Sequence, residues 1–159
     1  MQSLEDRYRS FHELLQQEDS LEETLRMLCK TLKTILSVEQ ASVLLYDKEE
    51  KQLWTVLMDQ KEKILVPYDQ GIVGETFRTA KVQLENEPYD NPNFFAEVDM
   101  QLGFYTQSIL AAPLFDEQDN VIGVIELLNK PGGFDKADHE CITYFANVIS
   151  DLLENNNIN

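Results

Sequence analysis

The spacing of apolar residues along the chain predicts helices at three places and strands at six. Leucines and other apolar side chains that recur every three or four positions form one face of an α-helix. Such stretches cover residues 3–17, 20–37 and 136–153. Short apolar runs bounded by polar or turn-forming residues predict strands. These runs cover residues 41–46, 52–58, 64–68, 82–84, 108–115 and 121–128. Gly71 and Gly74 mark the start of a further short helix ending near Ala80.

The connections between these runs predict how the strands pair. Residues 47–51 and 116–120 are short and polar, so the strands on either side of each form antiparallel hairpins. After the last strand, residues 129–133 break the pattern with Pro131 and two glycines. Asp135 is then the expected N-cap of the final helix, and Asp138 its third residue, where acidic side chains suit the positive end of the helix dipole.

One carboxylate interrupts the most apolar strand. Because side chains alternate along a strand, Glu126 shares a face with Ile122, Val124 and Leu128. A buried carboxylate without a partner costs several kcal/mol. We therefore expect a ligand, a hydrogen-bonding loop amide or a lysine beside Glu126.

Residues 86–107 form a long connection that is rich in aromatic residues. A connection of this length inside a compact domain is usually functional or disordered. Its aromatic side chains favour packing over the sheet, as a lid or as a small satellite core. These aromatic residues are Tyr89, Phe94, Phe95, Phe104 and Tyr105.

Length, charge and cysteine content limit the classes of function. The 159 residues predict one domain, and 13 basic against 29 acidic residues give a formal net charge of −16. This charge opposes binding to nucleic acid or to an anionic membrane. Two cysteines, Cys29 and Cys141, are too few for a disulfide framework or a zinc site and fit a reduced, cytoplasmic setting. We find no run long enough to span a membrane and no export signal.

Catalytic chemistry has little support in the sequence. Neither His12 nor His139 lies near a candidate nucleophile. The chain has no cluster of metal ligands, and the glycines of residues 71–74 lack the other positions of a phosphate-binding loop. We therefore expect no enzyme activity, no catalytic residue and no metal.

The order of these elements over residues 20–153 resembles a GAF domain. More narrowly, four residues resemble the Asn-Lys, Phe, Asp-Glu signature of the GAF domains that bind cyclic nucleotides in phosphodiesterases and bacterial adenylyl cyclases. These residues are Asn129, Lys130, Phe134 and Asp138. His139 stands where that family has the glutamate. The resemblance implies an α+β fold with α/β/α layers. A central antiparallel sheet of about six strands carries the N- and C-terminal helices on one face and short helices and the lid on the other.

The same resemblance implies roles for individual residues. Lys130 and Asp138 would form a structural ion pair beneath the binding site. Glu126 and Asp59 would be acceptors for the base, while helix N-terminal amides would hold a cyclic phosphate. Leu102 replaces a residue that is usually polar in the family. The full set of implied ligand-binding positions is Ser42, Met58, Asp59, Ile72, Val73, Tyr89, Asp99, Thr106 and Glu126.

These observations lead to one main hypothesis and two alternatives. The main hypothesis is a cytoplasmic regulatory GAF domain (residues 19–154) that binds cyclic GMP or cyclic AMP under the 86–107 lid. It would signal through its terminal helices to a homodimer partner or an attached output domain. Residues 1–18 would be an amphipathic dimer or linker helix, and residues 155–159 a disordered tail. One alternative is a dimerisation module of the same fold with no nucleotide. The other is a GAF-related methionine sulfoxide reductase, which would need reactive cysteines in the pocket.

Overall fold

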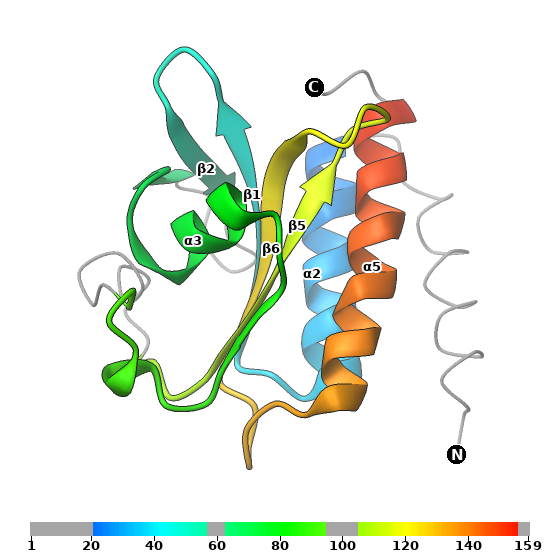
Figure 1. The fold of residues 1–159 in the computed structure, drawn as a ribbon. Coiled ribbons are helices and arrows are strands. Elements are labelled where there is room, and N and C mark those ends of the chain that lie inside the picture. Colours follow the sequence, from blue (N-terminus) through cyan, green and yellow to red (C-terminus); the bar gives the residue numbers. More distant parts are fainter. Residues whose placement is uncertain (1–20, 57–62, 95–104, 156–159) are drawn as a thin grey trace.

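A computed structural model describes residues 21–56, 63–94 and 105–155 (Figure 1). Within these residues, six strands form one sheet in the order β3-β2-β1-β6-β5-β4, and every neighbouring pair is antiparallel. The predicted first helix, Met58, Asp59, Asp99 and Leu102 lie outside the described residues. The strands are β1 (Gln40–Asp47), β2 (Gln52–Val56), β3 (Lys63–Pro67), β4 (Gln83–Glu85), β5 (Ile109–Phe115) and β6 (Val121–Leu128).

Helices cover both faces of the sheet, as the predicted layers require. Figure 1 shows α2 (Leu21–Leu36) and α5 (Lys136–Asn155) side by side on one face. The short helix α3 (Gly71–Thr79) lies on the other face, and a single 3-10 turn, η1 (Pro88–Asp90), follows β4. The fold prediction is confirmed. Helix α5 extends to Asn155, the first residue of the range that we expected to form a disordered tail.

The larger part of the core lies between the sheet and the pair α2 and α5. The helices contribute their apolar stripes, including Leu28, Leu32, Phe145 and Ile149, each 1% exposed or less. Both cysteines are buried in the same layer. Burying such side chains contributes about 1.5–3 kcal/mol each, so this layer supplies much of the stability.

The α3 face of the sheet has its own, smaller clusters. Leu44, Val124 and Ala111 pack with Val73 of α3, while Ile109 and Leu128 pack with Ile72.

The prediction that Ile122 lies on the same face as Glu126 is wrong. The Ile122 side chain joins the cluster on the α2 and α5 face instead. The register between β5 and β6 shifts here, because Leu114 pairs with Gly123 while Phe115 pairs with Val121. The extra residue on β6 is a β-bulge, which breaks the strict alternation of faces on which the prediction depended.

Candidate functional site

The strand register places a polar group at the centre of the α3 face. Ser42 of β1 and Ala111 of β5 are both paired with Glu126 of β6, one on each side. Directly paired residues point to the same face of a sheet. All three are buried, with Glu126 only 6% exposed. Ile72 and Val73, two other predicted site residues, belong to α3 on the same face and are buried in its clusters.

On this face, Ser42 Oγ and Gln40 Oε1 are buried and lack hydrogen-bond partners among the described residues. Ser42 is 2% exposed and Gln40 is 1% exposed. Leaving a buried polar group unsatisfied costs about 1–3 kcal/mol. Such a cost is expected where a bound molecule completes the hydrogen bonds. Gln40 was not among the predicted site residues, because the predicted strand began at Ala41.

Tyr89 belongs to a small aromatic cluster at the ends of the long connection. Its ring stacks on Tyr105 with centroids 5.8 Å apart and meets Phe94 edge-on at 5.0 Å. Phe94 in turn packs against the cluster of Ile72, Ile109 and Leu128 on the α3 face. Tyr89 and Tyr105 are 53% and 64% exposed. Thr106, another predicted ligand position, is fully buried.

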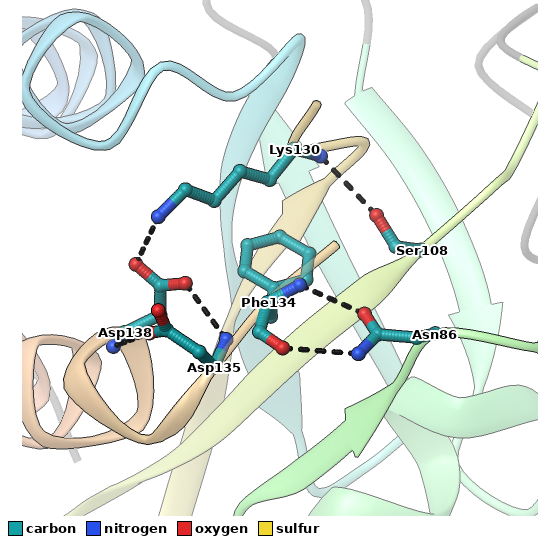
Figure 2. Close-up of polar contacts among 6 residues, drawn as sticks. All are labelled: Asn86, Ser108, Lys130, Phe134, Asp135 and Asp138. Carbon is teal, nitrogen blue, oxygen red and sulfur yellow. Dashed lines mark hydrogen bonds and ion pairs between the residues drawn. The ribbon is translucent and has the colours of Figure 1, made fainter. Parts of the chain in front are cut away.

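Two signature residues, Lys130 and Asp138, form a structural network with Asp135 at the start of α5 (Figure 2). Lys130 Nζ lies 2.5 Å from Asp138 Oδ1, which is the ion pair that the resemblance implied. The Asp135 amide donates to Asp138 Oδ2, and the Asp138 amide donates to Asp135 Oδ1. This reciprocal cap satisfies two amides at the helix start. The hydrogen bond from the Asp138 amide also lowers the pKa of the Asp135 carboxyl.

Asn129 ties the end of the long connection to β6 and to the start of β1. Its side-chain oxygen accepts hydrogen bonds from the amides of Gln107 (2.6 Å) and Ser108 (3.2 Å). Its side-chain nitrogen donates to the Tyr105 carbonyl (2.7 Å) and to the Glu39 carboxylate (2.8 Å). The backbone of Asn129 is left-handed, with φ of 63°, a conformation that asparagine tolerates better than most residues. Asn129 therefore has a structural role.

Asn86, which we did not predict as a site residue, holds the other end of the same connection. Its side-chain nitrogen donates to the Phe134 carbonyl at 2.9 Å, and its oxygen accepts from the Phe134 amide at 2.8 Å (Figure 2). Gly133 makes room for this clamp, since a Cβ there would lie 2.9 Å from Asn86 Oδ1. Both ends of residues 86–108 are thus bonded to the loop that leads into α5.

We expect Asn86→Ala to lower the free energy of unfolding by about 1–2 kcal/mol, because two hydrogen bonds to the Phe134 backbone are lost. Urea denaturation followed by circular dichroism would measure the change. Asn93→Ala is the matched control, because Asn93 is exposed and lies in the same connection. Equal stability of the Asn86 and Asn93 variants would show that the clamp does not hold the fold.

The two cysteines lie on the face of the sheet opposite to Ser42 and Glu126, which opposes the methionine sulfoxide reductase alternative. Cys29 is in α2 and Cys141 is in α5, and both are buried between the helices and the sheet. Burial raises the pKa of the Cys29 thiol to about 12, which keeps the thiol protonated and unreactive near neutral pH. The chain has two cysteines in all, and both lie on this face. No cysteine is therefore available for a redox reaction beside Glu126 and Ser42.

The described part of the chain lacks a metal site and a membrane-spanning helix. No group of three or more histidine, cysteine or acidic residues is placed to hold a metal ion there. None of the helices described is both long enough and apolar enough to cross a bilayer.

Comparison with known proteins identifies the family of the chain. The family model described as "GAF domain" matches residues 18–154, and the chain belongs to this family. The cGMP-specific 3',5'-cyclic phosphodiesterase of Drosophila pseudoobscura pseudoobscura is 33% identical over 89 residues. This match covers 56% of the chain but only 8% of the phosphodiesterase.

Solved structures share the fold at low sequence identity. The GAF domain of a phosphoenolpyruvate-protein phosphotransferase from Acinetobacter has a TM-score of 0.82 and 16% identity. The alignment covers 98% of this chain and 96% of that one. A free methionine-R-sulfoxide reductase from Neisseria meningitidis has a TM-score of 0.75 and 17% identity, with 94% and 87% covered. Proteins of different activity thus share this architecture, so the function must be argued from the site.

Proposed function

We propose that this chain is a regulatory GAF domain that binds a cyclic nucleotide on the α3 face of its sheet. The observation that carries the proposal is the group of buried polar side chains Gln40, Ser42 and Glu126 on one face. The side chains of Gln40 and Ser42 have oxygens without a partner among the described residues. The match to a cGMP-specific phosphodiesterase supports the same ligand class.

Helix α3 supplies a place for the cyclic phosphate. Gly71, Ile72 and Val73 form its first turn, and the first amides of a helix have no intrahelical acceptor. Together with the helix dipole they attract an anion. Gly71 takes a φ of 73°, which lets the chain enter the helix sharply. An anion could therefore bind on this face although the chain as a whole carries a net charge of −16.

The hydrogen bonds of the connection suggest how ligand binding could act on α5. Asn86 bonds to Phe134 at one end, and Ser108 bonds to Asn129 and Lys130 at the other. Phe134 lies two residues before the start of α5. A ligand that repositions residues 86–108 would pull on this loop and bias the position of α5.

Calorimetric titration with cyclic GMP and cyclic AMP tests the proposal. We expect a dissociation constant in the micromolar range or below, whereas no heat at about millimolar ligand would contradict binding of either nucleotide. Glu126→Gln removes the charged acceptor and should weaken binding about tenfold or more.

Glu117→Gln is the matched control for that variant. Glu117 is exposed in the β5–β6 hairpin, so its neutralisation changes the net charge equally but should leave affinity unchanged. Equal weakening in both variants would mean that only overall charge matters, and it would remove Glu126 from the site.

A further inference from the structure

Gln40 lies on the same face as Ser42 and Glu126. It is the first residue of β1 and pairs with Leu128 of β6. Leu128 packs in a cluster with Ile72 of α3. Because directly paired residues point to one face, the Gln40 side chain also belongs to the α3 face. Gln40 is 1% exposed, although glutamine is mostly found at protein surfaces.

The hydrogen bonds described next to Gln40 do not involve its side chain. The Glu39 amide donates to the carbonyls of Leu128 and Asn129. The Glu39 carboxylate accepts a hydrogen bond from the Asn129 side chain. Gln40 Oε1 has no hydrogen-bond partner among the described residues. A buried carboxamide whose oxygen has no partner among the described residues is suited to a ligand.

Gln40 complements Glu126 chemically. A carboxamide offers two N–H donors and an acceptor, whereas an ionised carboxylate only accepts. Opposite side chains on paired strands lie about 4.5–5.5 Å apart and diagonal ones about 7–8 Å apart. Ser42 is directly opposite Glu126, and Gln40 is diagonal to Glu126. One planar base could therefore reach both side chains.

We propose that Gln40 acts with Glu126 to select a guanine base over adenine, an inference that rests on the proposed function. The pairing edge of guanine carries two adjacent donors, N1–H and N2–H, which the Glu126 carboxylate would accept. Guanine O6 would accept a hydrogen bond from Gln40 Nε2, with the carboxamide turned so that its N–H donors take the place of Oε1. Adenine presents an unprotonated ring nitrogen in place of N1–H, which would face the carboxylate and repel it. A site built to hydrogen-bond one base discriminates strongly against a similar base that would leave the buried polar groups of the site unpaired.

The test compares cyclic GMP and cyclic AMP affinities of the wild type, Gln40→Leu and Gln52→Leu by calorimetry, with thermal unfolding of the ligand-free proteins. Gln52 is the matched control, because it lies on β2 and the adjacent Leu53 occupies the α3 face. We expect the wild type to prefer cyclic GMP. Gln40→Leu should weaken cyclic GMP binding about tenfold or more, with less effect on cyclic AMP. Its unliganded stability should be unchanged or higher, since leucine leaves no polar atom buried.

The outcomes separate this inference from the proposed function. A wild type that binds neither nucleotide overturns both. A wild type that binds cyclic GMP with the same affinity as Gln40→Leu overturns only the role of Gln40. A preference of the wild type for cyclic AMP overturns guanine selection. Lower stability of ligand-free Gln40→Leu with unchanged nucleotide selectivity assigns Gln40 a structural role instead.

Discussion

Asn129→Ala should lower the free energy of unfolding by about 3–5 kcal/mol. Four side-chain hydrogen bonds are lost, at about 1 kcal/mol each. Alanine must also adopt the left-handed backbone at φ of 63°, which adds about 1 kcal/mol. Urea denaturation of the purified domain measures the effect.

Two other substitutions at the same position separate these causes. Asn129→Gly loses the same hydrogen bonds but tolerates the left-handed backbone, so it should be about 1 kcal/mol more stable than the alanine variant. Asn129→Asp keeps the oxygen that accepts from Gln107 and Ser108 but brings a second carboxylate to Glu39. A loss below about 1 kcal/mol in Asn129→Ala would contradict the structural role of this residue.

Lys130→Met should destabilise the domain by about 3 kcal/mol, the lower end of the range for breaking a buried ion pair. The side chain of Asp138 is 4% exposed and that of Lys130 is 25% exposed. Removing the lysine takes away the opposite charge and leaves a buried carboxylate that still accepts from the Asp135 amide. The lower end applies because Lys130 is partly solvated.

The double variant Lys130→Met with Asp138→Asn is the informative comparison. It removes both charges, while the carboxamide introduced at position 138 keeps an oxygen for the Asp135 amide, so the double variant should recover much of the lost stability. Lys136→Met is the matched control, since Lys136 is exposed at the start of α5. A double variant no more stable than Lys130→Met would show that the buried charge is not the cause.

Strong local patterns made most of the fold predictable. Strand β6 has the predicted bounds, since a run of eight positions, all apolar except Glu126, is flanked by turn formers. The N-cap Asp135 and the third helical residue Asp138 also lie where predicted, because capping depends on residues three apart. The face of Glu126 followed from the alternation of side chains along a strand.

Features that depend on distant residues were not predictable in this way. The clamp between Asn86 and Phe134 joins residues 48 positions apart, and no local pattern indicates such a pair. The bulge that turns Ile122 away from the α3 face arises from the pairing of β5 with β6. Gln40 was missed because a polar residue at the edge of an apolar run gives no sign of burial.

The central claim is that the buried polar group on the α3 face is completed by a ligand. Crystals grown with cyclic GMP at a concentration well above its measured dissociation constant test the claim most directly. Electron density for the nucleotide beside Glu126 and Ser42, with the phosphate at the first turn of α3, is the predicted result. A nucleotide bound elsewhere, or apolar side chains filling the space beside Glu126, would contradict the account.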